Sequence, residues 1–145
     1  MPVLALNKRA AFDYAIEERL EAGIELTGHE TKSAKMGHID LSGARALVNP
    51  KGAYLVGASI HSFQPNNAPK GYDPERTRKL LMRRSEIDNL MGKTQSGLTI
   101  VPLKAYTARA RVKIELGLGK IRKKQDKREY LKKREAEREI RKFRK

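Results

Sequence analysis

The side chains best suited to chemistry in this sequence are cationic, and the chemistry open to them is the neutralisation of phosphate groups. They form three clusters ahead of a strongly basic C-terminal segment. Three aromatic rings near them, Phe12, Tyr14 and Tyr72, can stack on unpaired bases, although the strand pattern favours a core position for Tyr14. These residue types together favour contact with the backbone of a folded RNA. The clusters are residues 7–9, residues 32–35, and the set Arg76, Arg78, Lys79, Arg83 and Arg84.

The sequence contains no motif typical of a catalytic site or a metal site. His29, His38 and His61 lack the spacing typical of metal ligands, and the chain has no Cys. It also lacks a phosphate-binding glycine loop. Glu17 and Glu21 lie on one polar face of a predicted strand, where contact with solvent accounts for them. We therefore expect no enzymatic activity, no metal site and no cofactor.

The positive charge is concentrated at the end of the chain. The 145 residues include 32 Lys or Arg and 17 Asp or Glu, and residues 119–145 alone carry a net charge of +9. This segment has few apolar residues and no Gly or Pro after Gly119, so it can form a helix but has little surface to bury. We interpret it as an arm that a large anionic partner orders; a helix that is merely solvated is the alternative.

One folded domain followed by this arm is the expected organisation, with residues 1–118 as the body and residues 119–145 as the tail. Hydrophobic residues make up 39% of the chain, enough for one modest core. No segment has the roughly 18 consecutive apolar residues of a membrane span, and the first apolar run is too short for a signal peptide. We expect a cytoplasmic protein with no membrane partner.

Hydrophobic periodicity predicts the strands that position the polar residues. Apolar residues alternate with polar ones over residues 13–27 and residues 111–118, which is typical of half-buried strands. Residues 44–48 and 53–60 are expected to form a hairpin around a four-residue loop. A further strand is expected at residues 98–106, joined to the last strand by a turn at residues 107–110.

Short helices are expected between the strands. Thr27 and Glu30 can form a capping box at the start of one helix. A single helical turn is predicted to begin at Asp73, and another helix is predicted over residues 85–91, ended by the glycine that follows. Many strands at short spacing, with few helices, favour a mainly β fold of the small antiparallel barrel or sandwich type.

Five segments taken together resemble the small protein B family, the SsrA-binding proteins of bacteria. They are ALNKRA, EAGIELTGHETKS, DPERTRKLLM, GLTIVPLKAY and KKQDKREYLKKRE, and their order and spacing match over nearly the whole chain. The resemblance implies a six-stranded antiparallel OB-like β-barrel with short helices. It also implies a basic C-terminal tail that is disordered when free and helical on the ribosome. Only this motif set separates the family from an ordinary ribosomal or rRNA-binding protein, which the composition fits equally well.

The function of that family follows as an expectation. Its members bind transfer-messenger RNA (tmRNA, or SsrA RNA) at the tRNA-like domain and deliver it to the A site of stalled 70S ribosomes. The tail occupies the empty mRNA channel beyond the small-subunit decoding centre, which allows nascent-peptide tagging and ribosome rescue in trans-translation. Elongation factor Tu, carrying alanyl-tmRNA, is implied as an indirect partner. The resemblance implies a bacterial cytoplasmic monomer.

The resemblance also assigns roles to individual residues. Because a carboxylate repels phosphate, Glu21 is expected to accept a hydrogen bond from a base or a sugar hydroxyl, or to orient a cation. Ile121 stands where the family usually has Gly, so the hinge of the tail is expected at Gly117 and Gly119. The implied tmRNA-binding residues are Asn7, Lys8, Glu21, Gly28, Glu30, Lys32, Ser33, Arg76, Arg78, Lys79 and Leu81. The implied ribosome-contacting tail residues are Lys120, Arg122, Lys123, Asp126, Lys127 and Arg128.

Overall fold

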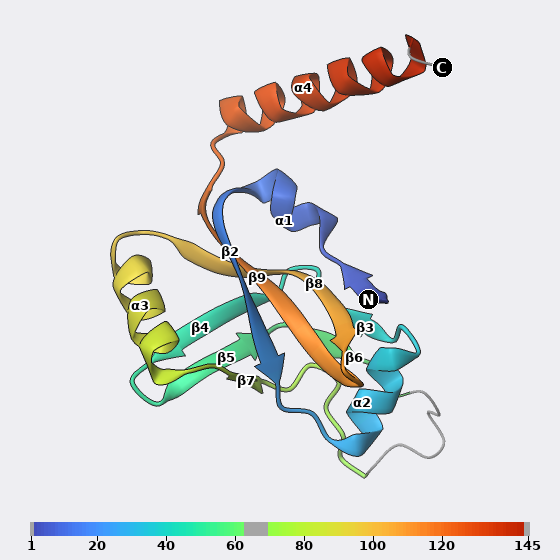
Figure 1. Cartoon of the computed structure of the whole chain (residues 1–145), viewed down its shortest axis with the longest axis vertical. Helices are drawn as coiled ribbons and strands as arrows, with labels where there is room; N and C mark the ends of the chain where they lie inside the picture. Colours follow the sequence, from blue (N-terminus) through green and yellow to red (C-terminus); the bar gives the residue numbers. More distant parts are fainter. Residues whose placement is uncertain (1, 63–69, 144–145) are drawn as a thin grey trace.

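Strands dominate the computed structural model, which describes residues 2–62 and 70–143, with side chains described through residue 139 (Figure 1). The strands are β1 (Val3–Leu6), β2 (Tyr14–Ile24), β3 (Ile39–Asp40), β4 (Arg45–Asn49), β5 (Gly52–Val56), β6 (Ser59–Ile60), β7 (Arg78–Leu81), β8 (Thr99–Ala108) and β9 (Arg111–Ile121). The helices are α1 (Lys8–Asp13), α2 (Gly28–Lys35), α3 (Arg84–Gln95) and α4 (Lys124–Phe143). The predicted mainly β fold with short helices is confirmed.

Six strands form a closed ring. The order runs β8-β4-β5-β7-β2-β9 and returns to β8, and every pairing in it is antiparallel. The pairing of β4 with β8 is the narrowest, since it joins only Ala46 to Ile100. β1 extends the sheet along β8, and β3 pairs with β6 in a separate small sheet. Closing the ring satisfies strand edges that would otherwise be left open.

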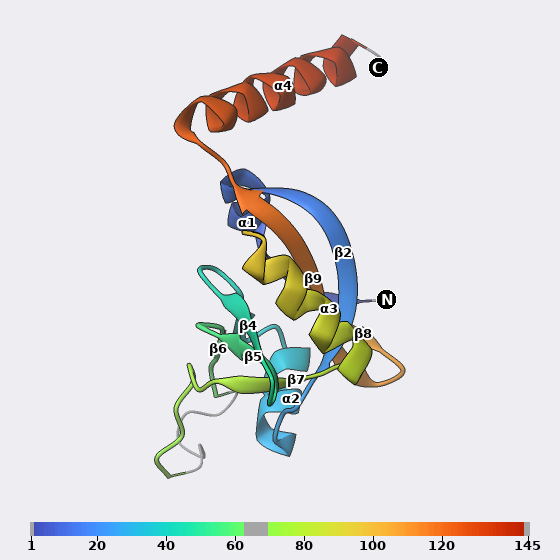
Figure 2. The same ribbon diagram turned by 90° about the vertical axis from the view of Figure 1, so that its left-hand side faces the viewer.

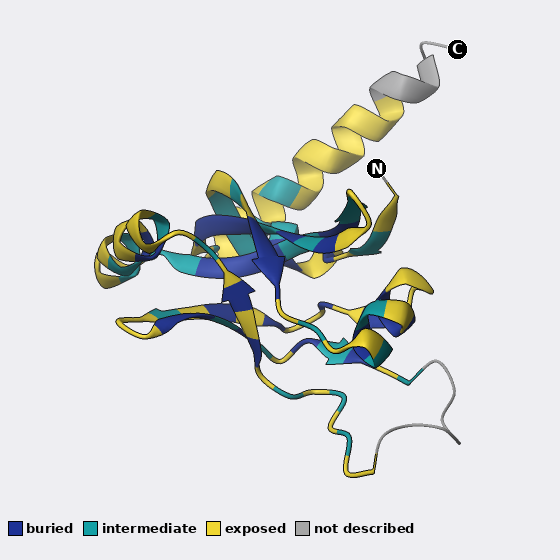
Figure 3. Cartoon of the chain, turned by 60° about the horizontal axis from the view of Figure 1, so that its bottom comes forward, coloured by how far each residue is buried: buried dark blue, intermediate teal, exposed yellow. Residues whose placement is uncertain are grey.

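The core lies inside the ring and is made by the alternation seen in the sequence. In β9, Val112, Ile114, Leu116 and Leu118 are buried, whereas the residues between them turn outward or are glycines. Burying such side chains is the main source of stability for a domain of this size. Figure 3 shows buried residues along the strands and exposed ones along α4.

The hairpin between β4 and β5 is tighter than predicted. Asn49 pairs with Gly52, so the loop contains two residues and the prediction of four is wrong. The Asn49 side chain closes it by accepting a hydrogen bond from the Lys51 N–H at 2.8 Å. The strand predicted over residues 53–60 is divided into β5 and β6, because the chain turns between them at Gly57, whose φ is +83°.

The predicted helical turn from Asp73 does not continue through Arg78, because residues Arg78–Leu81 are strand β7. This strand pairs with β5 on one side and β2 on the other, and these neighbours outweigh the local helix signal. The predicted end of the following helix is also wrong. α3 passes through Gly92 to Gln95, and the chain leaves it at Gly97, which has a φ of +103°.

A turn joins the last two strands where one is predicted, but it contains only Arg109 and Ala110 rather than residues 107–110, because Ala108 pairs with Arg111. Arg109 and Ala110 both have positive φ, 52° and 66°, which is the type I′ arrangement that matches the twist of a hairpin. Residues other than glycine rarely adopt this conformation, so the residue types at these two positions do not predict this type of turn. The ladder from Ala108 opposite Arg111 onward holds the turn in place.

The first residues of the predicted tail belong to the sheet. In β9, Lys120 pairs with Ala15 and Ile121 pairs with Tyr14. The prediction of a hinge at Gly117 and Gly119 is wrong, because both pair with β2 and β8. α4 then projects away from the ring on the side of α1, as two perpendicular views show (Figures 1 and 2). Within the described residues, no helix combines the length and apolar character that crossing a bilayer requires.

Candidate nucleic-acid interface

A groove on the outer surface of the ring, of about 730 Å³, brings together residues distant in sequence. We call it the basic groove. It collects three residues from two predicted motifs, Glu21 on β2 and both Lys79 and Leu81 on β7. The strands β2 and β7 are neighbours in the ring, which explains this convergence. Its cations and polar residues are Glu21, Lys51, Lys79, Arg83, Arg84, Glu86 and Lys113.

The electrostatics of the basic groove favour an anionic ligand. Five of these side chains are cations and two are carboxylates. One carboxylate, Glu86, accepts a hydrogen bond from the backbone N–H of Arg83 at 3.0 Å and so caps α3. Lys79 and Arg83 are exposed. A phosphate backbone that enters this groove therefore meets several exposed cations at once.

Glu21 differs from these cations in charge and in how it is held. The hydroxyl of Tyr106, on β8, donates a hydrogen bond to Oε2 of Glu21. Burial raises the pKa of Tyr106, and the hydrogen bond to Glu21 raises it further, so the phenol stays protonated and remains a donor. Glu21 itself is exposed.

Leu81 places an apolar surface beside these charged groups. Its relative exposure is 51%, high for a leucine in a paired strand. A smaller hollow adjoins the basic groove and shares Leu81, Gly23 and Lys113 with it. Thr31 lines that hollow, so α2 borders it. The combined surface offers cations for phosphate and an apolar contact for a base or ribose.

Glu30 lies in a buried ion cluster rather than at a surface. Arg78 donates from Nε to Glu30 Oε2 at 2.9 Å, and Arg76 donates from its own Nε to the same oxygen at 2.9 Å. The side chains of Glu30 and Arg78 are fully buried, and that of Arg76 is 37% exposed. Arg78 also donates to the carbonyl oxygen of Ala58 at 3.0 Å. The cluster ties α2 to β7 and to the chain before it.

Burial would raise the pKa of Glu30, but hydrogen bonds from Arg76, from the Thr27 N–H and from Arg78 outweigh it and lower the pKa to about 2. Glu30 is therefore ionised at neutral pH. The Tyr72 hydroxyl accepts a hydrogen bond from Nη2 of Arg78 at 3.3 Å and donates to the Ile60 carbonyl oxygen at 2.6 Å, which joins Tyr72 to the cluster.

The buried side chain of Asn7 also forms its hydrogen bonds within the protein. Its Oδ1 accepts from the Ala10 N–H at 3.2 Å and caps α1, while Nδ2 donates to the carbonyl oxygens of Leu41 and Pro102 at 3.1 and 2.8 Å. Ser33 is also buried. Among the other residues implied for tmRNA, Lys8, Gly28 and Lys32 are exposed, on α1 and α2.

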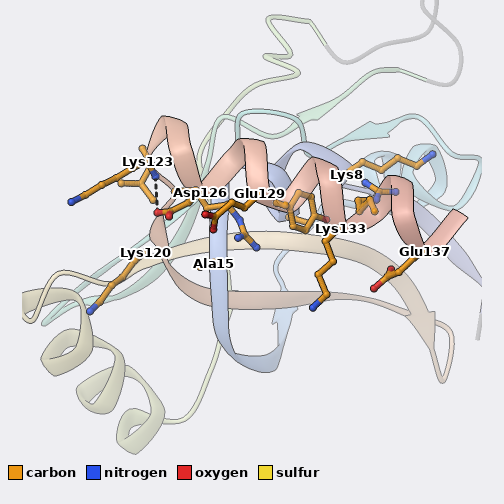
Figure 4. A pocket seen from close by; sticks show the side chains of 13 residues that line it. Lys8, Ala15, Lys120, Lys123, Asp126, Glu129, Lys133 and Glu137 are labelled. Atoms are coloured by element: carbon orange, nitrogen blue, oxygen red, sulfur yellow. Dashed lines mark hydrogen bonds between the residues drawn. The ribbon is translucent and has the colours of Figure 1, made fainter. Parts of the chain in front are cut away.

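A second hollow lies between α1, the end of β9 and α4, and we call it the tail hollow (Figure 4). It gathers Lys8 with the start of the predicted tail. Its lining includes Lys8, Lys120, Arg122, Lys123, Asp126, Lys133 and Arg134. Ala15 lines the tail hollow and Gly23 lines the basic groove, both on β2. At about 3.3 Å per strand residue, the parts of β2 that line the two sites are roughly 20–25 Å apart along the strand.

The tail residues hold the first turns of α4 to the body. Asp126 accepts from the backbone N–H of Lys123 at 3.4 Å, so it helps to cap α4. The Nζ of Lys127 lies 3.3 Å from Oδ1 of Asp13. The guanidinium of Arg122 lies 4.4 Å from the ring centre of Tyr130. The Arg128 side chain is exposed.

Two groove residues, Lys113 and Lys51, and the tyrosine that contacts Glu21 are not among the residues that the sequence singles out for the site. The alternation of polar and apolar residues in β9 places Lys113 on the outer face of that strand, but it does not indicate that Lys113 lines a groove. Lys51 belongs to the hairpin loop, and no local signal connects it to Lys79. Tyr106 was included only as part of a family motif, and its contact with Glu21 depends on how β8, β9 and β2 align.

Comparisons with known proteins agree on one family. The family model described as SmpB protein matches residues 4–145. The SsrA-binding protein of Caldicellulosiruptor saccharolyticus is 45% identical over 141 residues, which cover 97% of this chain and 89% of that relative. The SsrA-binding protein of Mesoplasma florum is 46% identical over 143 residues, covering 97% and 96%. A solved chain described under "tmRNA-SmpB: a journey to the center of the bacterial ribosome" has a TM-score of 0.69 and 38% identity, over 90% of this chain and 95% of that one.

Proposed function

Because this chain belongs to the SmpB protein family, we propose that it binds tmRNA, the SsrA RNA, and acts in trans-translation on stalled ribosomes. The relatives are SsrA-binding proteins, and the matching solved chain comes from work on tmRNA-SmpB and the bacterial ribosome. The function is one of binding rather than catalysis. Its partners are the tRNA-like domain of tmRNA and the 70S ribosome, and its setting is the bacterial cytoplasm.

The observation that carries this proposal is the basic groove. Glu21, Lys79 and Leu81 come from motifs that are far apart in sequence, and the ring brings them to one surface. The direct contacts to tmRNA are assigned to these three residues and to the exposed Lys8, Gly28 and Lys32. Asn7, Glu30, Ser33 and Arg78 are buried, so we assign them to holding α1, α2 and β7 in place. Arg76 is partly exposed and belongs to both groups.

The finer architecture is part of the same proposal. The six-stranded ring is taken as an OB-like barrel that forms the RNA-binding body. The tail is disordered when free and becomes helical in the empty mRNA channel. Elongation factor Tu with alanyl-tmRNA is an indirect partner, and the protein acts as a monomer. The residues assigned to the decoding centre are Lys120, Arg122, Lys123, Asp126, Lys127 and Arg128.

A truncation experiment tests whether the body and the tail have separate roles. A chain that ends at Lys123 keeps all of β9 and loses α4. We expect its affinity for the tRNA-like domain to stay within about threefold of the full chain, since the basic groove is intact. Peptide tagging on ribosomes stalled without a stop codon is expected to disappear. Affinity is measured by gel shift and tagging in a reconstituted translation system.

A chain that ends at Leu118 is the matched contrast. It also removes Lys120 and Ile121, which pair with Ala15 and Tyr14 in β2, so it is expected to lose stability as well as tagging. Normal tagging by the chain that ends at Lys123 would contradict the proposed role of the tail.

A further inference from the structure

Glu21 occupies an unusual electrostatic position in the basic groove. It lies directly opposite Glu115 in the pairing of β2 with β9, and like charges in that arrangement are unfavourable. Glu115 is compensated by Arg19 at 3.1 Å and by Lys104 at 3.4 Å. Among the ion pairs of the described residues, none involves Glu21. The groove, which five cations line, thus contains an exposed carboxylate that forms no ion pair among the described residues.

Tyr106 holds that carboxylate by one oxygen. In β8 it lies opposite Lys113 of β9, so its hydroxyl reaches diagonally across β9 to Oε2 of Glu21. The tyrosine is only 6% exposed, and the ammonium of Lys104 lies 5.5 Å from its ring centre. A buried ring has little rotational freedom, so this donor fixes the carboxylate. The other oxygen, Oε1, makes no hydrogen bond within the described part of the chain.

We infer that Tyr106 is a positioning residue for RNA recognition, which orients Glu21 so that Oε1 accepts a hydrogen bond from a ribose 2′-hydroxyl or a purine amino group. This inference rests on the proposed function. A phosphate has no hydrogen to donate at neutral pH and is repelled by the carboxylate. The surrounding cations supply sequence-independent attraction, whereas Glu21 accepts only a donor at one defined place.

The variant Tyr106→Phe tests the inference because it removes the hydroxyl and keeps the ring. We expect the full-length variant to bind the tRNA-like domain of tmRNA about tenfold more weakly than the wild type. In a Glu21→Ala background, the same change is expected to alter Kd by less than about twofold, because the hydroxyl acts through that carboxylate. Tyr14→Phe is the matched control. Its hydroxyl, at the far end of β2, makes no hydrogen bond among the described residues, so wild-type affinity is expected.

A purely structural role for Tyr106 would weaken binding by the same factor in both backgrounds, and that result would overturn the inference. Wild-type affinity in Tyr106→Phe would overturn it too. Both outcomes leave the proposed function intact, since the wild-type chain still binds. If the wild-type chain itself failed to bind the tRNA-like domain, the proposed function and the inference would fall together.

The source of the donor is identified by nucleotide-analogue interference. Two series of RNA are used, one with 2′-deoxy substitutions and one in which purines lack their amino groups. A position that weakens wild-type binding but not binding by Glu21→Ala supports the inference and names the donor as ribose or base. The absence of any such position in both series would contradict it.

Discussion

At the scale of single residues, Glu30 has the largest predicted effect on the fold, because one buried carboxylate compensates two arginines. Arg78 is fully buried, so its charge has no access to solvent. Removing one partner of a buried ion pair leaves the other uncompensated, which costs more than the pair contributes. The cluster also joins α2 to β7, which carries Lys79 and Leu81 into the basic groove.

We predict that Glu30→Ala lowers the free energy of unfolding by about 3–5 kcal/mol. The pKa of Glu30 is about 2 in the folded protein, below its ordinary value of 4.5, so the unfolded chain binds more protons between these values. The wild type should therefore lose on the order of 3 kcal/mol as the pH falls through this window. Urea unfolding at several pH values measures both effects.

The exposed Glu17 supplies a control for this experiment, since Glu17→Ala removes a carboxylate from the surface of β2. Its unfolding free energy is expected to stay within about 0.5 kcal/mol of the wild type. A loss below about 1 kcal/mol in Glu30→Ala, or an unchanged acid response of Glu30→Gln relative to the wild type, would show that the cluster does not stabilise the fold as described.

The residues of the candidate site could be named from sequence, but their depth in the molecule could not. Arg78 and Lys79 are adjacent cations in one motif, yet Arg78 is fully buried and Lys79 is exposed. The difference arises because successive side chains of β7 point to opposite faces, and the segment was predicted as a helical turn. The partner of Arg78, Glu30, is 48 residues away, so no local pattern connects them.

At the scale of elements, the contact between β2 and β9 depends on a glycine. A Cβ atom at Gly119 would lie 2.3 Å from the carbonyl oxygen of Ala15, which belongs to the backbone and cannot move aside. Gly119 is therefore required for the close approach of two strands rather than for a turn. The approach keeps the end of β9 on β2 and sets where the chain leaves the ring toward α4.

We predict that Gly119→Ala destabilises the protein by about 2–3 kcal/mol, at the upper end of the usual cost of overpacking, because the added methyl group would meet backbone atoms. Gly28→Ala is the matched control, since a Cβ atom at Gly28 would meet nothing within 4 Å and the residue begins α2. Its effect is expected to lie within about 1 kcal/mol of zero. Thermal and urea unfolding compare the two. Equal stability of both variants would mean that β2 and β9 do not approach this closely.

Elements with a sequence signal of their own were predicted well. The capping box of Thr27 with Glu30 is present, and the alternation of β9 gives its buried face. Elements whose conformation depends on contacts with residues far away in the sequence were not predicted correctly. β7 is a strand because β5 and β2 flank it, and α3 continues through Gly92 because a single glycine in a helix costs only about 1 kcal/mol.

At the scale of the whole molecule, the charge is divided between two surfaces. The net charge is +15, of which residues 119–145 contribute +9. The parts of β2 that line the basic groove and the tail hollow are roughly 20–25 Å apart along the strand. One RNA can therefore fill the groove while α4 stays accessible to another. The proposed roles of body and tail use this separation, and Lys8 is the one residue proposed to contact tmRNA that lies beside the tail.

The central claim is that the body recognises one RNA rather than any polyanion. The most direct measurement compares the affinity of the full chain for the tRNA-like domain of tmRNA, an ordinary tRNA and an rRNA fragment of equal length, at one fixed salt concentration. The account predicts at least about tenfold tighter binding to the tRNA-like domain. Equal affinity for all three RNAs would contradict it and would favour a general rRNA-binding protein.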